Sequence, residues 1–418
     1  MTSSNRFVRA CSYLACTSAA LAAMQPAFAA WELVPDLELT VQTRENPRLN
    51  VGGSTIADDD DSATSMVFNG RLAMSNVSPR GELFVEPRIR TDAYADTADE
   101  ELESDDLFLD VRGTRRWRRG AAGVRGYFSQ ESILYSELLE AEPLDPNVDD
   151  PVAVDTGRLV RFDQNRDRVT LAPFADLQIS ERSSVVLEAR YLDIAYDGER
   201  VSGRSDFTDT LFSAGVQRQI DDRNRATARL LISQFEADAN QNVTDTIGVE
   251  GTFARVISDI WTFMLSTGLR RSDIEFRDSQ GVLVDDVDTN FALSLGFRKR
   301  SDRSILNFDV RRLIDPNSSG FLEQRDELRV SLRRQMSPTL TGGIAFRVID
   351  SSVLGDINSS NRDYARVNLN LEWALTRAWA VGVGYDMIYQ KFEGQTRDAT
   401  SNGIKVGVNY RGLSRTGS

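Results

Sequence analysis

The sequence predicts an all-β protein, a transmembrane antiparallel up-and-down β-barrel of about 18 strands, with 16 also possible. The first observation is a strict alternation of apolar and polar residues, clearest in Asp326–Arg333 and Arg366–Trp373. Successive side chains of a strand point to opposite faces, so each stretch has one apolar and one polar side. The second observation is that short and long connections alternate, as they do in bacterial barrels with short periplasmic turns and long extracellular loops.

The first thirty residues are typical of a secretory signal peptide. Arg6 and Arg9 precede a short apolar stretch over 10–24, and Pro26–Ala30 ends in a small-x-small cleavage pattern. A retained membrane anchor is the alternative, but the apolar run is short for one. We therefore expect residues 1–30 to be a cleaved signal peptide that directs export through the inner membrane, and residues 31–418 to form one barrel.

Each predicted strand is an alternating stretch bounded by turn-forming or charged residues. In chain order, the predicted strands cover 36–44, 64–75, 82–93, 106–115, 121–129, 168–178, 184–195, 207–219, 225–236, 244–255, 260–271, 289–299, 304–313, 326–335, 339–349, 364–374, 378–390 and 401–411. An even number of strands places both termini of the barrel chain on the side of the short turns, which is the periplasm. Prolines weaken a strand ladder, so Pro87 and Pro173 are expected to mark bulges or bends.

The connections differ in length and charge. Short turns such as Asn76–Arg80 and Asp221–Asn224 are expected in the periplasm, with Trp117, Trp261, Trp373 and Trp379 forming an aromatic girdle beside them. The long connections are acidic and are expected to be extracellular. Clustered carboxylates suit divalent cations, although a solvated surface loop is the simpler interpretation. Segment 130–166 is the longest connection, and we expect it to fold into the lumen as a constriction.

The polar faces of the strands are rich in arginine. The candidate lumen-facing residues are Arg88, Arg90, Arg112, Arg125, Arg190, Arg229, Arg298, Arg311, Arg329, Arg333, Arg347 and Arg366. Acids such as Glu86, Asp110, Glu188 and Asp386 share this face. One interpretation is that arginines and acids pair across strands and brace the wall. The other is a cationic track for anionic or hydroxyl-rich solutes, since guanidinium binds carboxylate and phosphate bidentately.

Composition argues against several classes of function. The chain has no histidine, and both cysteines, Cys11 and Cys16, lie in the leader, so the usual catalytic bases, nucleophiles and soft metal ligands are missing. We expect no enzyme activity, no cofactor and no metal site. The formal net charge of −14 makes nucleic acid an unsuitable partner.

Two segments carry a family resemblance. The opening Trp31–Leu39, followed by Arg44–Leu49, resembles the start of the outer-membrane β-barrel porin family of Gram-negative bacteria, some members of which are encoded beside exopolysaccharide gene clusters. Glu45 stands where that family usually has Asp. The last strand, Lys405–Tyr410, resembles the signal read by the barrel-assembly machinery, although the chain continues to Ser418 instead of ending on Phe or Trp.

The resemblance implies an outer-membrane conduit for small polar solutes or an exported polysaccharide, with outer-membrane lipid, lipopolysaccharide and the barrel-assembly machinery as partners. The alternative is a non-conducting barrel that acts as an adhesin or assembly scaffold through its extracellular loops. A conduit predicts that Arg329→Glu with Arg366→Glu changes ion selectivity. A scaffold predicts loss of partner binding when 130–166 is trimmed.

Overall fold

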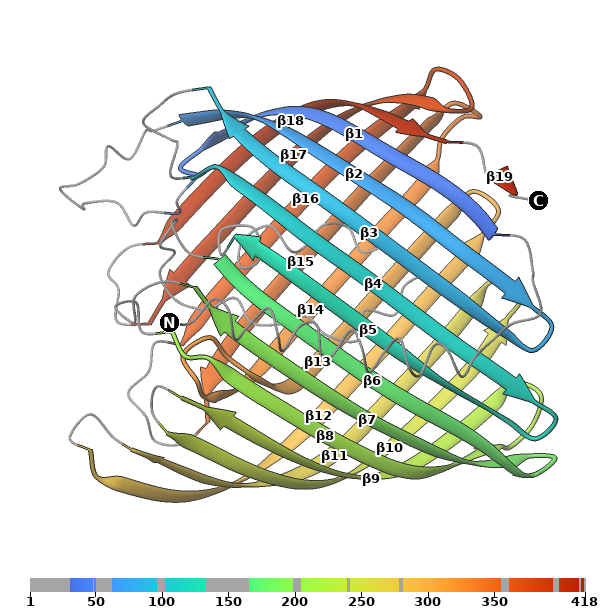
Figure 1. Cartoon of the computed structure of the whole chain (residues 1–418), viewed down its shortest axis with the longest axis vertical. Helices are drawn as coiled ribbons and strands as arrows, with labels where there is room; N and C mark the ends of the chain where they lie inside the picture. Colours follow the sequence, from blue (N-terminus) through green and yellow to red (C-terminus); the bar gives the residue numbers. More distant parts are fainter. Residues whose placement is uncertain are drawn as a thin grey trace.

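A computed structural model shows a closed antiparallel barrel of 18 strands, as the alternation predicts (Figure 1). It describes residues 31–47, 49, 62–95, 102–132, 165–197, 204–238, 241–277, 281–354, 361–393, 398–412 and 415–416. Every strand pairs with its neighbours in the sequence, and β1 pairs with β18 to close the wall. Residues 415–416 add a two-residue strand, β19, beside the start of β1.

The strands are long enough to cross a bilayer at a tilt. Their bounds are β1 Trp31–Glu45, β2 Ser62–Ser78, β3 Gly81–Tyr94, β4 Ser104–Trp117, β5 Gly120–Ser132, β6 Asn165–Ser180, β7 Ser183–Tyr196, β8 Phe207–Gln219, β9 Asn224–Ala237, β10 Asn242–Ser258, β11 Trp261–Arg277, β12 Leu283–Ser301, β13 Ser304–Pro316, β14 Leu322–Gln335, β15 Leu340–Val353, β16 Arg362–Ala374, β17 Trp379–Phe392 and β18 Ala399–Arg411. Within the described ranges, no helix is long and apolar enough to cross a membrane.

One end of the barrel carries the short turns and the other the longer connections (Figure 1). We call these the turn end and the loop end. A turn such as the one between β8 and β9 is fixed by its own side chain: Asp221 accepts hydrogen bonds from the Arg223 and Asn224 backbone N–H groups. The side-chain amide of Asn224 also donates to Asp221, and these bonds lower the pKa of this exposed carboxyl.

Pro87 and Pro173 were predicted to mark bulges or bends, and the prediction of bulges is wrong. Pairing of β2 with β3 is interrupted at Pro87, but the register is the same on either side, with Arg71 opposite Arg88 and Met74 opposite Val85. The same holds for β6 and β7 around Pro173. A missing N–H removes one ladder bond without requiring an extra residue. Register shifts occur instead near the turn end, at Val256/Ser258 and Gln178/Ser180.

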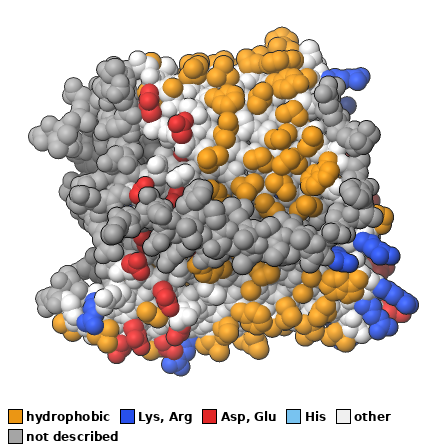
Figure 2. Space-filling view, viewed as in Figure 1, with side chains coloured by type: hydrophobic (Ala, Val, Ile, Leu, Met, Phe, Trp, Pro, Cys, Tyr) orange, Lys and Arg blue, Asp and Glu red, His pale blue; other side chains and the backbone are white. Residues whose placement is uncertain are grey.

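The two faces of the wall differ sharply. Outward positions carry exposed apolar side chains, such as Leu369, Val383 and Ile404, which is 60% exposed. Figure 2 shows hydrophobic side chains gathered in a broad band on the face of the wall that it presents. The inward neighbours Asn368 and Asp386 are polar and buried. This is the pattern of a barrel with lipid outside and polar groups inside.

Buried apolar side chains gather at the loop end, on the inner face. One cluster joins strands β7 to β9 with β11, β13 and β14; its members are Leu192, Ile194, Phe207, Phe235, Ala237, Ile274, Phe276, Ile314, Leu322 and Leu354. A second cluster lies where the first and last strands meet, formed by Leu49, Ala63, Leu102, Ile349, Tyr364, Ile388 and Ala399. The inner face near the loops therefore carries two packed apolar clusters.

The tip of the β13–β14 hairpin leaves the wall and bends into the lumen. β13 pairs with β12 only as far as Arg312 opposite Leu293, although β12 begins at Leu283. Beyond that point, the Ile314 carbonyl accepts a hydrogen bond of 3.5 Å from Arg270, an inward-facing residue of β11. The ring of Phe321 packs edge-on against Phe276, with centroids 5.8 Å apart. The hairpin thus crosses the inner side of β11 and β12.

Inside the barrel, the hairpin tip reaches past β11 and is held by residues next to β8 and at the start of β10. The Ser205 backbone N–H donates to the Ser318 carbonyl at 2.8 Å, and the side-chain amide of Asn242 donates to the Gly320 carbonyl at 2.8 Å. Residues 315–325 lie in a stretch predicted to be an extracellular loop; they instead form the inward-bent tip of this hairpin, with the ends of β13 and β14. The expected constriction over 130–166 lies mostly outside the described residues.

Candidate functional site in the barrel interior

Three arginines stand side by side on the inner face of neighbouring strands. Arg329 of β14 lies opposite Arg347 of β15, and Arg347 lies opposite Arg366 of β16. Like charges directly opposite each other destabilise a sheet. Such a row therefore requires carboxylates close by.

Two carboxylates meet that requirement. Glu327 accepts hydrogen bonds from Arg347 at 2.7 Å and from Arg329 at 3.0 Å. Asp386 accepts from Arg366 at 2.7 Å and from Arg44 at 2.8 Å. We call these six residues, Arg44, Glu327, Arg329, Arg347, Arg366 and Asp386, the arginine cluster. Each carboxylate is shared by two guanidinium groups, so the cluster carries excess positive charge.

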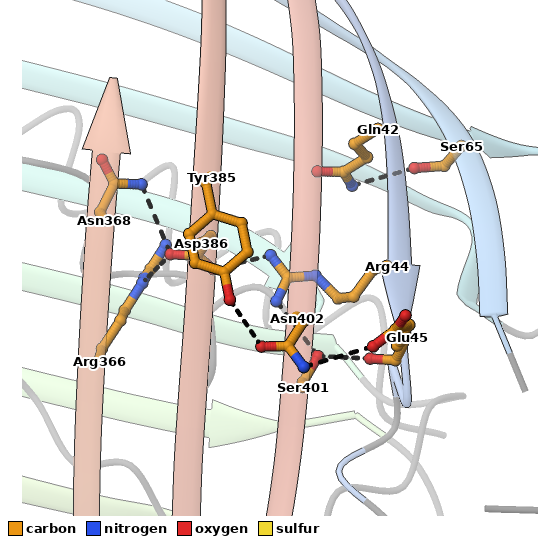
Figure 3. Close-up of polar contacts among 10 residues, drawn as sticks. All are labelled: Gln42, Arg44, Glu45, Ser65, Arg366, Asn368, Tyr385, Asp386, Ser401 and Asn402. Carbon is orange, nitrogen blue, oxygen red and sulfur yellow. Dashed lines mark hydrogen bonds and ion pairs between the residues drawn. The ribbon is translucent and has the colours of Figure 1, made fainter. Parts of the chain in front are cut away.

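The ion pair between Arg44 and Asp386 spans a whole strand. Arg44 belongs to β1 and Asp386 to β17, and Gly403 of β18 is the register partner of both (Figure 3). A Cβ atom at Gly403 would lie 3.2 Å from the Arg44 guanidinium carbon. The glycine therefore leaves the space through which Arg44 reaches Asp386. Ser401, also on β18, accepts a further hydrogen bond from Arg44 at 3.3 Å.

The arginine cluster lies in the more enclosed half of the interior. Exposure of the Glu327 side chain is 1%, and that of Arg329, the most exposed member, is 16%. Inner-face arginines nearer the turn end are more open: Arg71 and Arg112 are each 39% exposed. Inner-face arginines are thus less exposed toward the loop end, where the arginine cluster lies.

Further along the wall, on β3 to β6, arginines lie over aromatic rings. The Arg88 guanidinium carbon is 3.9 Å from the centre of the Phe108 ring, and that of Arg125 is 5.6 Å from the centre of Phe174. Cation–π contacts of this kind hold a guanidinium in place over the face of a ring. Arg125 and Phe174 also line a recess of about 510 Å³, together with Arg229 and Glu188.

All twelve arginines predicted from the sequence lie on strands, on the inward side of the alternation. Arg329, Arg347 and Arg366 belong to the arginine cluster. Five others form ion pairs with inward acids, namely Arg90 with Asp92, Arg112 with Asp110, Arg190 with Asp209, Arg229 with Glu188 and Arg311 with Asp309. Arg88 and Arg125 lie over rings, and Arg298 and Arg333 are nearer the turn end. Their role in solute passage stays a prediction.

Several inner arginines did not enter the predicted set. Arg44 joins the arginine cluster, Arg325 pairs with Asp315 at 2.7 Å, and Arg166 pairs with Glu131 at 2.7 Å. Arg166 and Arg325 fall in stretches assigned to loops, because the apolar half of the alternation stops before the strand does. Arg325 could have been found from the two-residue spacing of inner-face residues, which continues from Arg329 through Glu327 to Arg325.

Replacing Asp386 by asparagine is expected to destabilise the barrel by about 3–5 kcal/mol, because Arg44 and Arg366 would both lose the buried carboxylate with which they pair. The measurement is the free energy of unfolding by urea in lipid vesicles. Asp273→Asn is the control. Asp273 pairs with Arg271 on the outer face, and both side chains are about 60% exposed, so the expected loss in the free energy of unfolding is about 0–1 kcal/mol. Equal losses in the two variants would show that Asp386 has no special structural weight.

Comparisons with known proteins find only distant similarity. No family model matches the chain, and no curated protein matches it. Among solved structures, it resembles OccAB2 of Acinetobacter baumannii (10% identity, 93% of this chain and 100% of that one, TM-score 0.46). It also resembles OpdO of Pseudomonas aeruginosa (12%, 92% and 97%, 0.45) and OpdK of the same organism, solved with vanillate (10%, 92% and 99%, 0.45). Likeness this distant carries no argument about function.

Proposed function

We propose that this chain is an outer-membrane channel for small polar solutes, with a preference for anions. The observation that carries the proposal is the arginine cluster, in which four guanidinium groups share two carboxylates on the inner face of a closed barrel. An interior lined in this way attracts anions and offers N–H donors in the planar arrangement that suits carboxylate and phosphate.

The proposed membrane location is supported by the outer surface. A soluble protein rarely exposes a continuous apolar band around its whole circumference, and lipid is the medium that such a band fits. The signal-peptide pattern of the first thirty residues supports export, and bacterial barrels of this type reside in the outer membrane. The short turns then face the periplasm and the loop end faces outward.

The size of the solute is suggested by the inward hairpin. The β13–β14 tip crosses part of the interior and is held there by hydrogen bonds to Ser205 and Asn242. A passage reduced in this way favours small hydrated solutes over a polysaccharide chain. We therefore place small organic and inorganic anions first among the candidate solutes.

A non-conducting barrel is the second candidate, and a specific observation favours it. The two apolar clusters at the loop end are buried on the inner face, where an open pore would expose them to water. In that case the barrel would act as a scaffold for its surface loops. Passage of solute separates the two proposals.

Vesicle swelling provides this separation. Vesicles containing the refolded chain are diluted into isotonic solutions of arabinose, gluconate or a dextran, and entry is followed by light scattering. The channel proposal expects swelling with arabinose and gluconate and none with dextran. A barrel that is folded and inserted but admits neither small solute would establish the scaffold instead.

A further inference from the structure

The outer face of the barrel has a strong asymmetry of charge between its two ends. Near the turn end, the charged residues that point outward from the strands are cations: Arg115, Arg218, Arg255, Lys299 and Arg334. Among the described strand residues, no Asp or Glu shares that outward face at this end, while the turns themselves carry both signs. On the face that Figure 2 presents, Lys and Arg side chains lie mainly at the turn end beside the hydrophobic band, and Asp and Glu side chains lie mainly toward the loop end.

Outward positions near the loop end have the opposite character. The exposed acids there are Glu45, Asp105, Glu236, Asp245, Asp273, Glu275, Asp285, Asp350 and Asp363. Four outward cations lie among them: Arg271, Arg277, Arg312 and Lys391. A net charge of −14 for the whole chain makes a purely cationic rim at the turn end all the more unexpected.

The cations at the turn end lie at the depth of an aromatic girdle. Lys299 is the register partner of Trp261, and its Nζ lies 5.4 Å from the centre of the indole ring. Trp373 and Trp379 are about half exposed on the same outward face, and Trp117 follows Arg115 by two residues. Aromatic girdles sit at the level of lipid headgroups, so the neighbouring cations reach the headgroup phosphates.

We propose that Arg218, Arg255, Lys299 and Arg334 form a rim that binds the phosphates of anionic phospholipids in the leaflet at the turn end. Among the described residues, neither Arg218 nor Arg334 forms an ion pair with a carboxylate. Guanidinium binds phosphate bidentately, and basic residues beside a membrane favour anionic lipid. The rim is continuous with the apolar band, which makes lipid its occupant. The inference rests on the membrane location proposed above.

Tryptophan fluorescence reports on the turn end alone. All five tryptophans of the chain, Trp31, Trp117, Trp261, Trp373 and Trp379, lie on strands at the turn end. Quenching of their fluorescence by brominated lipid therefore measures which lipids surround the rim. The refolded chain is placed in phosphatidylcholine vesicles that contain either brominated phosphatidylglycerol or brominated phosphatidylcholine, and relative binding is obtained from the two quenching curves.

We expect phosphatidylglycerol to be preferred by at least about twofold. The combined variant Arg218→Gln, Arg255→Gln, Lys299→Gln and Arg334→Gln is expected to lower the ratio to about one. The matched control removes four positive charges from the outward face at the loop end, with Arg271→Gln, Arg277→Gln, Arg312→Gln and Lys391→Gln. It should keep the preference for phosphatidylglycerol. Arg218→Lys, Arg255→Lys and Arg334→Lys together should also keep it, because the charge is retained. Shifted mobility of unheated protein on a gel confirms that each variant is folded.

A ratio near one in the unmodified chain, or an equal loss in the loop-end control, would overturn the rim while leaving the channel proposal intact. Absence of quenching by either brominated lipid would instead remove the membrane location, and the channel with it.

Discussion

Replacing Arg329 and Arg366 together by glutamine is expected to abolish most of the anion preference of the channel. Each carboxylate keeps one arginine, since Glu327 retains Arg347 and Asp386 retains Arg44. The arginine cluster loses its excess charge without leaving a buried carboxylate unpaired, so the fold is expected to persist. At about 4 Å in a water-like medium, one unit charge contributes about 1 kcal/mol, or about fivefold in the local concentration of an anion.

The measurement is the reversal potential across a planar bilayer under a potassium chloride gradient. We expect the ratio of anion to cation permeability to fall by about fivefold or more for the pair of substitutions. The control, Arg271→Gln with Arg312→Gln, removes the same charge from the outer face and should leave the ratio unchanged. If both variants retain the ratio of the unmodified chain, the arginine cluster does not line the conducting path.

Replacing Gly320 by valine is expected to release the inward hairpin and to raise the conductance. Gly320 has φ of +81°, and an added Cβ would lie 2.8 Å from the Cβ of Ser205 and 2.9 Å from that of Ala237. The left-handed backbone costs about 1–2 kcal/mol for a residue with a side chain, and the overpacking adds about 1–3 kcal/mol. A total of roughly 3 kcal/mol shifts the ratio of docked to undocked tips by about a hundredfold.

Gly281 provides a matched control for this effect. Its φ is +77°, but no atom lies within 4 Å of an added Cβ. Gly281→Val therefore imposes the same backbone cost without displacing the hairpin, and its conductance should equal that of the unmodified chain. The hairpin is not the constriction if the two valine variants conduct alike.

Most of the barrel could be predicted because the alternation of residues in each strand reflects the surroundings of its two faces. The alternation in Arg366–Trp373 predicts a strand with one apolar and one polar face, and the closed 18-strand barrel confirms that strand. Strand ends were less predictable. β12 begins at Leu283 instead of 289. Asp285 continues the pairing with β11 although it is a charged residue on the outward face, because an apolar side chain is not required beyond the apolar band.

The arrangement of the interior could be predicted only in part. Arginine on the inward face follows from alternation, but which arginine meets which acid depends on register between strands. The pair of Arg44 with Asp386 joins residues at opposite ends of the chain and depends on Gly403 between them. The inward bend of the β13–β14 hairpin depends on contacts with Ser205 and Asn242. The residues around Gly320 show no local pattern that predicts these contacts.

Single-channel conductance of the refolded chain in a planar bilayer, with ion selectivity recorded, tests the central claim most directly. The account predicts discrete conductance steps that prefer anions. A protein that is folded and inserted in the bilayer but shows no steps, or steps that prefer cations, would contradict an anion-selective channel lined by the arginine cluster.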